Sequence, residues 1–368
     1  MGSAIDCIAL ASRIDRSGET VIRSEARDRC LVCGSEGLPL HSDVPDLLLG
    51  TPGRWRVVRC RAADCGLLWL NPRPLPEELG SLYQNYFTHE ADVPDRNSQG
   101  LRDQVRRAMQ QRLLGYPARV STRVRALAAW VQLIPWYRAS AMRELFWLPA
   151  TDTGRLLDIG CGNGRPMQRF VAAGWAATGI DFDAEAVTAA RSAGLDARVG
   201  ALKEQAFPDA HFDVVLMSHV IEHLADPMAD LTECRRILKP SGSIVIATPN
   251  AHGLGHLAFG RHWLGLDPPR HLQIFTPKAL TRLLAMSGFR PMRVRTHAGV
   301  AASWAVASLW RRDAEAIGRL AQLPVAETRV PVGWLALARL QSIAVAVGAE
   351  WGDELVGRYA PRGIAEGG

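Results

Sequence analysis

Lysine is nearly absent from this chain of 368 residues. Of its 43 basic residues, only Lys203, Lys239 and Lys278 are lysines. No lysine cluster of the kind found in many nucleic-acid-binding proteins is therefore present. The formal net charge of +6 is spread over a large surface and favours anionic partners only weakly. The charge distribution thus favours a small molecule over a nucleic acid as the partner.

Long uninterrupted apolar segments are also missing. Residues 332–349 come nearest, but Arg339 and Gln341 interrupt them, and the apolar run Ile5–Ser12 contains Asp6 and no recognisable cleavage site. We therefore expect a cytoplasmic protein with no signal peptide and no transmembrane span. For residues 332–349 we expect a helix partly buried in the core, with membrane attachment as the alternative.

Cysteine is scarce, at seven residues, but four of the seven form two close pairs, Cys30-x-x-Cys33 and Cys60-x-x-x-x-Cys65. In a reducing compartment such pairs favour metal binding over disulfide formation. Four thiolates complete the tetrahedral shell of a structural zinc ion and leave no open position for catalysis. A glycine follows each pair, as in zinc-ribbon knuckles. We predict structural Zn2+ at this site, with free buried thiols as the alternative.

Composition divides the chain into five segments. They are a polar arm (1–28), the four-cysteine zinc-binding module (29–87), a linker with basic amphipathic helices (88–150), an α/β core (151–300), and a helical insertion with a final strand (301–368). Residues 101–148 carry nine arginines against two acidic residues. Such a face is usually solvated, but it could also meet an acidic substrate, RNA or lipid headgroups.

Strands alternate with helices from Gly154 onward. The predicted strands are apolar runs at 155–159, 175–180, 212–217 and 243–248. Continuously apolar strands indicate a parallel sheet covered on both faces. The predicted fold class is therefore α/β, doubly wound and mostly parallel, with a small zinc-ribbon-like module at the N-terminus.

The first strand leads into a glycine-rich turn, Asp158-Ile-Gly160-Cys-Gly162-Asn-Gly164. Such a turn lets a ligand lie against bare backbone at a helix N-terminus. A dinucleotide-binding fingerprint would need glycine or alanine at the place of Arg165, so the spacing points to a different ligand.

This turn resembles the first motif of class I S-adenosylmethionine-dependent methyltransferases. Three later segments resemble further motifs of that family in the same order: Gly179-Ile-Asp181, Phe207–Leu216 and Arg236–Ile246. The resemblance covers residues 154–295 and implies a seven-stranded Rossmann-like sheet that binds S-adenosyl-L-methionine.

The resemblance also implies cofactor contacts. Asp158 would orient the methionine amino group, Asp181 would bind the ribose hydroxyls, and Phe182 would pack on adenine. Many members have Gly-Asp after the third strand where this chain has Gly200-Ala201, so backbone groups would hold adenine here. The full predicted cofactor set is Asp158, Gly160, Gly162, Gly164, Asp181, Phe182, Ala201, Leu202 and Ser218.

The stretch His219-Val-Ile-Glu222-His223 matches a zinc-protease pattern, but that pattern needs both histidines on a helix. Here the stretch follows a buried strand and precedes a helix that begins with Asp226 and Pro227. We therefore expect a loop at the carboxyl end of the strand, where such sheets bind ligands. His219 is predicted to face the methyl acceptor, either as a general base or as a wall of the pocket, with His223 lining the same pocket.

A second candidate acceptor segment is Asp267–Pro277, because in this family the corresponding insertion commonly caps the acceptor pocket. We predict a catalytic role for His271, and substrate contacts for Arg270 and Trp263.

Together these features predict a methyltransferase acting on oxygen or carbon of a small molecule such as a sugar, a polyketide or a quinone-like compound. Cys65-Gly-Leu67, Asn71–Pro76 and Tyr83–Tyr86 resemble sugar methyltransferases with a four-cysteine module. The alternatives are a ribosomal or transfer RNA methyltransferase and a non-catalytic protein that binds the cofactor or S-adenosylhomocysteine. Residues 301–349 are expected to enclose the acceptor or to form a homodimer interface, and Asp353–Ala360 to return as the last, antiparallel strand.

Overall fold

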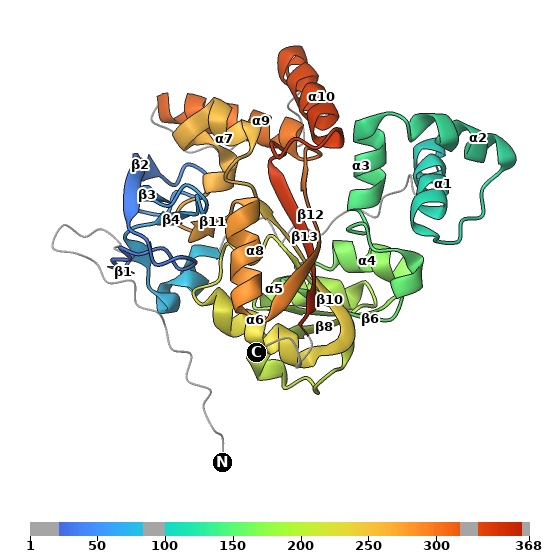
Figure 1. The fold of residues 1–368 in the computed structure, drawn as a ribbon, viewed down its shortest axis with the longest axis horizontal. Coiled ribbons are helices and arrows are strands. Elements are labelled where there is room, and N and C mark those ends of the chain that lie inside the picture. The colour runs from blue at the N-terminus through green and yellow to red at the C-terminus, as the bar shows by residue number, and fades with distance from the viewer. Residues whose placement is uncertain (1–21, 84–99, 317–329, 363–368) are drawn as a thin grey trace.

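The computed structural model describes residues 22–83, 100–316 and 330–362. Most of the predicted arm, the linker at 88–99 and Tyr86 lie outside the described residues. A seven-stranded sheet with strand order β12-β13-β10-β9-β6-β7-β8 forms the centre (Figure 1). Its strands are β6 (Arg155–Ile159), β7 (Ala176–Asp181), β8 (Asp196–Val199), β9 (Phe212–Ser218), β10 (Leu238–Pro249), β12 (Phe289–His297) and β13 (Glu354–Pro361).

Strand direction in this sheet follows the prediction. The strands from β10 through β9, β6 and β7 to β8 are parallel, whereas β13 runs antiparallel to both β10 and β12. The predicted α/β class, with a last strand that returns antiparallel, is thus confirmed.

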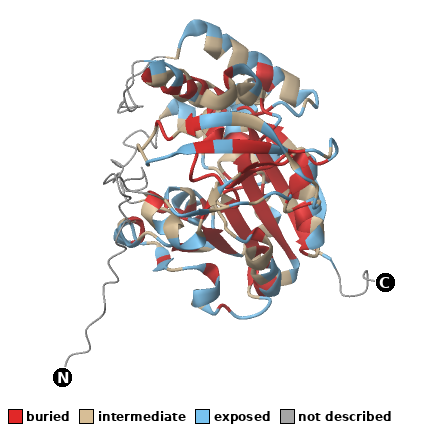
Figure 2. Cartoon of the chain, turned by 90° about the vertical axis from the view of Figure 1, so that its left-hand side faces the viewer, coloured by how far each residue is buried: buried red, intermediate tan, exposed pale blue. Residues whose placement is uncertain are grey.

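Helices cover both faces of the sheet, and the strands between them are buried (Figure 2). The four covering helices are α4 (Arg165–Ala172), α5 (Ala184–Ser192), α6 (Pro227–Ile237) and α8 (Pro277–Met286). Helix α6 shows how local sequence sets a boundary: the Asp226 side chain accepts from the Ala229 N–H at 3.1 Å, and Pro227 takes the first helical position. Leu231 and Cys234 then face the core, as their spacing predicts.

Five further helices lie outside this core. The basic segment folds into α1 (Leu101–Leu114), α2 (Thr122–Val131) and α3 (Pro135–Arg143); α9 (Ala301–Ala316) and α10 (Val332–Ala346) are inserted between β12 and β13. Shorter elements are α7 (Leu254–Phe259), η1 (Pro76–Tyr83), η3 (Ala150–Asp152), η4 (Leu202–Gln205), η5 (Gly260–His262) and η6 (Leu264–Leu266). None of the helices described is long and apolar enough to cross a bilayer.

The cysteine module shares a sheet with the core. Its strands β2 (Gly37–Pro45), β3 (Arg54–Cys60) and β4 (Leu68–Leu70) pair in the order β11-β4-β3-β2, where β11 (Gln273–Ile274) belongs to the predicted acceptor segment. The Thr276 hydroxyl also donates to the Cys65 carbonyl at 2.6 Å. The module and the acceptor segment are therefore one structural unit, which the sequence did not predict.

Part of the predicted polar arm is ordered. Strand β1 (Ser24–Glu25) pairs antiparallel with β5 (Arg73–Pro74), and the Trp69 indole donates to the Arg27 carbonyl at 2.8 Å. Residues 22–28 therefore belong to the cysteine module, in contrast to the boundary expected from composition.

Candidate active site

The glycine turn after β6 needs its glycines. Gly160, Gly162 and Gly164 have φ values of 71°, 53° and 82°, a region that side chains other than glycine rarely adopt. A Cβ on Gly160 would lie 2.5 Å from Val220 Cγ2, and one on Gly164 2.3 Å from Leu195 Cδ1. The turn is thus closely packed from behind, and its three glycines place no side chain in the way of a ligand at the start of α4.

Asp158 lies near the end of β6 and is buried, and in the described part of the chain one of its carboxyl oxygens has no hydrogen-bond partner. The residue is only 1% exposed, and its Oδ2 has no hydrogen-bond partner among the described residues. Burial, and next the charge of Asp181, raise the pKa of Asp158 to about 8. A buried carboxylate without a partner is costly, so this oxygen is suited to receive a cationic or hydrogen-bond-donating ligand group.

The next strand supplies the second carboxylate. Asp181 Oδ2 accepts from the Gly162 N–H at 2.8 Å, and Oδ1 accepts from the Asp183 N–H at 3.0 Å. Phe182 beside it is 58% exposed, and its ring meets the Tyr83 ring edge-on at 5.2 Å between centroids. Asp181 therefore fixes the turn, while Phe182 offers an accessible aromatic face.

The remaining predicted cofactor residues differ in exposure. Leu202 is buried, whereas Ala201 is exposed at the start of η4. Ser218 is half-buried at the end of β9, with its hydroxyl 3.5 Å from Arg143 Nη2.

The stretch after β9 is a turn and not a helix, so the protease geometry is absent. His219 has φ 56°, and its ring lies between two buried carboxylates: Nδ1 is 3.2 Å from Glu222 Oε1, and Nε2 is 3.0 Å from Glu354 Oε1. Burial alone lowers the pKa of His219, but the two carboxylates outweigh it and raise this pKa to about 9. His219 is therefore an imidazolium at neutral pH.

Glu354 joins distant parts of the chain. It is fully buried at the start of β13, and the Arg143 guanidinium from α3 binds it through Nε at 2.6 Å and Nη2 at 2.5 Å. His297 Nδ1 at the end of β12 lies 3.4 Å from Glu354 Oε2. No sequence signal marked Glu354 or Arg143, because their pairing depends on contacts more than two hundred residues apart.

His223 differs from His219 in charge. Burial, and next the neighbouring His271, lower the pKa of His223 to about 4, so its ring is neutral near pH 7. Its Nδ1 is 2.6 Å from the Tyr83 hydroxyl and 3.1 Å from the Arg270 carbonyl. The His271 ring lies 4.6 Å away and contacts the Gly265 carbonyl through Nδ1 at 2.8 Å. A neutral histidine with a tyrosine hydroxyl can accept or relay a proton.

Glu222, His223 and His271 also bring potential metal-ligand atoms within 4.8 Å of one another. The Glu222 carboxylate, however, already pairs with the His219 imidazolium. That cation opposes a second positive charge at the same carboxylate.

Arg270 and Trp263 lie deeper than a substrate-binding role would suggest. The Arg270 side chain is 0% exposed, and Asp46 and Asp267 bind it from two sides at 2.6–2.9 Å. Trp263 is also 0% exposed and packs against His256 and Trp304. Their predicted substrate contacts stay predictions, and the geometry favours a role in holding the loop.

The four module cysteines meet in space. Cys30 Sγ lies 3.7 Å from Cys65 Sγ, Cys33 Sγ lies 3.2 Å from Cys60 Sγ, and all four sulfurs lie within 4.8 Å of one another. Sulfurs around a tetrahedral zinc ion lie about 3.8 Å apart, so the cluster fits such an ion.

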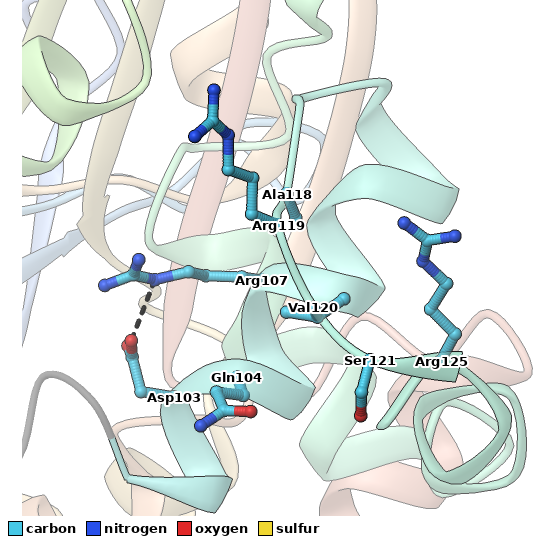
Figure 3. A pocket seen from close by; sticks show the side chains of 8 residues that line it. All are labelled: Asp103, Gln104, Arg107, Ala118, Arg119, Val120, Ser121 and Arg125. Atoms are coloured by element: carbon cyan, nitrogen blue, oxygen red, sulfur yellow. Dashed lines mark ion pairs between the residues drawn. The ribbon is translucent and has the colours of Figure 1, made fainter. Parts of the chain in front are cut away.

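A separate surface pocket of about 570 Å³ lies on the N-terminal helices α1 and α2 (Figure 3). Arg107, Arg119 and Arg125 line it together with Ser121, and Asp103 forms an ion pair with Arg107 inside it. The pocket lies between α1 and the start of α2 and contains none of the predicted site residues.

Comparison with known proteins supports the reading of the turn. Residues 123–294 match a family described as "Methyltransferase domain". A ubiquinone biosynthesis O-methyltransferase of Cereibacter sphaeroides is 34% identical over 150 residues, which are 38% of this chain and 61% of that protein. A probable S-adenosylmethionine-dependent methyltransferase of Mycolicibacterium smegmatis is 36% identical over 140 residues, 36% of this chain and 51% of that protein.

The chain thus spans between about half and three fifths of the length of these relatives. The family match over residues 123–294 includes the glycine turn and the strands from β6 to β10, but not β13. A solved structure of a methyltransferase from Archaeoglobus fulgidus aligns with 63% of this chain and 98% of that chain, at 19% identity and a TM-score of 0.40. The family match begins at residue 123, after the cysteine module, so the module is interpreted from its own geometry.

Proposed function

We propose that this chain is a class I S-adenosylmethionine-dependent methyltransferase that transfers a methyl group to a small-molecule acceptor, because residues 123–294 match a methyltransferase domain. The observation that carries the proposal is the unpartnered, buried carboxylate of Asp158 beside a glycine turn at the carboxyl edge of the sheet. The site has the groups for an amine, a ribose and an aromatic ring, at Asp158, Asp181 and Phe182.

S-adenosylmethionine supplies an electrophilic methyl group when it is bound. The chain's own residues would hold its parts: Asp158 would accept a hydrogen bond from the amino group, the glycine turn would leave room for the aminoacyl part, and Asp181 would bind the ribose hydroxyls. In-line placement of the acceptor does most of the remaining work, because methyl transfer needs alignment more than acid–base chemistry.

We place the acceptor at the Tyr83–His223 pair. His223 is neutral and Tyr83 lies against it, so an acceptor hydroxyl can give up its proton there. His219 is a positioning residue in this proposal, because as an imidazolium between two carboxylates it has no free acceptor nitrogen. Oxygen is the favoured acceptor atom, since relatives named as O-methyltransferases share the domain.

Cys30, Cys33, Cys60 and Cys65 hold a structural Zn2+ ion in this proposal. A four-thiolate site is closed, so the ion takes no part in methyl transfer and stabilises the module.

The pKa of Asp158 predicts how cofactor affinity depends on pH. A ligand amine requires the carboxylate form, so below about pH 8 binding must release a proton from Asp158. We expect the affinity for S-adenosylhomocysteine to fall as pH is lowered from 8 to 6, by up to about tenfold per pH unit. Titration calorimetry on wild type and Asp158→Asn measures this. The variant should bind more weakly and lose the dependence, whereas Asp209→Asn, at an exposed carboxylate, should keep it. Equal pH profiles in wild type and Asp158→Asn would contradict the assignment.

We expect substitutions of Tyr83 and His223 to slow methyl transfer without weakening cofactor binding. Tyr83→Phe keeps the ring against Phe182 and removes only the hydroxyl, and His223→Gln removes the imidazole. Each is expected to lower kcat by about 10²–10⁴-fold, with cofactor affinity changed by less than about threefold. Single-turnover methyl transfer with a labelled cofactor gives the rate, and calorimetry gives the affinity. A normal rate in both variants would mean that alignment alone drives the reaction.

The test of the proposed function is native mass spectrometry with S-adenosylhomocysteine, followed by a labelled-methyl screen of catechols, phenols and sugars. One bound cofactor and one zinc ion per chain, with a methylated product, support the proposal. If the protein binds the cofactor but methylates no acceptor, it is a non-catalytic binding protein. If it methylates RNA and no small molecule, RNA is the substrate. Failure to bind the cofactor contradicts the reading of the glycine turn.

A further inference from the structure

Helix α10 buries two polar side chains and exposes several large apolar ones. Gln341 and Ser342 are buried, and the Gln341 amide donates to the Trp351 carbonyl at 2.5 Å and to Asp353 Oδ2 at 3.1 Å. The exposed apolar side chains on and beside the helix are Val332 (83% exposed), Leu340 (62%), Ile343 (45%), Val347 (82%) and Trp351 (57%). A surface helix in water usually buries its apolar face, so this exposed apolar face has no partner among the described residues and is suited to bind one.

The neighbouring helices continue this face. At the α2–α3 corner, Trp130 is 74% exposed, Leu133 68% and Tyr137 52%. Helix α3 packs against α10 (Figure 1). The Arg339 guanidinium lies 5.5 Å from the centre of the Trp136 ring. Nine of the eighteen large apolar side chains found exposed in the described residues lie between 122 and 143 or between 331 and 351. The exposure is therefore concentrated in one region.

Four arginines lie on or beside the same elements as these exposed apolar side chains. Arg138 on α3, Arg339 on α10, and Arg293 and Arg295 on β12 have no carboxylate within ion-pair distance in the described part of the chain. Burial, and next the charges of Arg293 and Arg138, lower the pKa of Arg295 to about 10. Arg295 is half-buried, with its guanidinium 4.6 Å from the centre of the Trp147 ring. Helix α10 contacts β12, so this charge lies beside the apolar residues.

We propose that this face, formed by the exposed apolar residues of α2, α3 and α10 with Arg138, Arg293, Arg295 and Arg339, binds the surface of an anionic phospholipid bilayer. Apolar groups enter the boundary between headgroups and acyl chains, while arginines contact lipid phosphates. The exposed Trp130 and Trp351 suit that boundary, where tryptophan is enriched.

The positive charge of this face favours an anionic bilayer over a second copy of the chain as its partner. A two-fold interface brings the same patch together with itself, so the arginines of both copies would be gathered in one interface. Like charges in an interface oppose association, whereas anionic lipids neutralise them. The proposal does not depend on methyl transfer, since binding can be measured without cofactor or acceptor.

The test is sedimentation of the full chain with vesicles of phosphatidylcholine plus phosphatidylglycerol, and with phosphatidylcholine alone. We expect binding to the anionic vesicles, at least about tenfold weaker binding to neutral vesicles, and weakening by salt. Leu340→Glu with Ile343→Glu should reduce binding at least about tenfold, and Arg138→Gln with Arg339→Gln should remove most of the preference for anionic lipid. Val171→Glu, at an exposed apolar side chain on α4, is the matched control.

Circular dichroism and the Tm of each variant show that the fold is kept. Absence of vesicle binding, or binding that neither double variant weakens, overturns the proposal. So does a dimer in light scattering that Leu340→Glu with Ile343→Glu dissociates, because the face would then belong to a second copy. If variants at Tyr83 or Asp158 bind vesicles as wild type does, bilayer binding is independent of catalysis, as proposed.

Discussion

Replacing Arg270 by alanine is expected to lower the free energy of unfolding by about 3–5 kcal/mol. The guanidinium is fully buried between Asp46 and Asp267, which are themselves 4% and 3% exposed. Its removal would leave two carboxylates buried near each other without a counter-ion in direct contact. The cost therefore comes from the charges left behind more than from the bonds lost.

Urea denaturation near pH 7 measures this change, and Arg54→Ala is the matched control. Arg54 pairs with Asp43 at 3.2 Å, but both side chains are more than half exposed, so its loss should cost less than about 1 kcal/mol. Equal effects of the two substitutions would contradict the burial of the Arg270 pair.

The pH dependence gives a second readout of the same variant. Burial raises the pKa of Asp267, but Arg270 outweighs this and holds that pKa below its usual range. The stability from this contact is therefore present above the ordinary pKa near 4 and is lost as pH falls through the lower, folded-state pKa. In the variant the carboxyls become easier to protonate, so the difference from wild type should shrink in acid.

Arg270 also shows what the sequence could not predict. A charged residue in a loop beside two prolines and a histidine is typical of a ligand-binding segment, and the sequence prediction assigned it to the acceptor. Its two carboxylate partners are 224 and 3 residues away, so burial is decided by packing of the module against the loop. The residues near Arg270 in the sequence therefore do not indicate that it is buried.

Other features could be predicted because local physics decides them. The glycine turn needs positive φ, Asp226 caps the helix that follows the histidine loop, and Gly34 and Gly66 take φ values of 73° and 63° behind the cysteine pairs. In contrast, the pairing of β11 with β4 and the contact of Arg143 with Glu354 join segments about two hundred residues apart. Such contacts depend on the assembled fold, and neither has a periodicity that would reveal it.

The pairing of β11 with β4 leads to the second large prediction. Cys65→Ser is expected to abolish zinc binding and to unfold the cysteine module, because a structural zinc site contributes about 10–16 kcal/mol in small zinc domains. Metal content by mass spectrometry should fall from one ion to none. Cys234→Ser is the matched control, since Cys234 is buried on α6 and belongs to no cysteine cluster.

The effect should reach the acceptor segment and stop short of the cofactor turn. Gln273 faces Trp69 and Ile274 faces Leu68 across the shared sheet, and the Leu272 N–H donates to the Glu222 carbonyl at 2.8 Å. Loss of the module therefore removes the edge that holds residues 268–276. Asp158 and Asp181 lie on β6 and β7, which pair only within the large sheet.

Hydrogen exchange separates these regions without any measurement of activity. In Cys65→Ser, exchange should increase at residues 268–276, while S-adenosylhomocysteine affinity stays within about threefold of wild type. Protection of that segment in a zinc-free protein would mean that β11 holds its place without the module. Loss of cofactor binding as well would mean that the two domains unfold as one cooperative unit. The expected pattern, a mobile acceptor segment with an intact cofactor site, would identify the zinc module as the support on which the acceptor pocket is built.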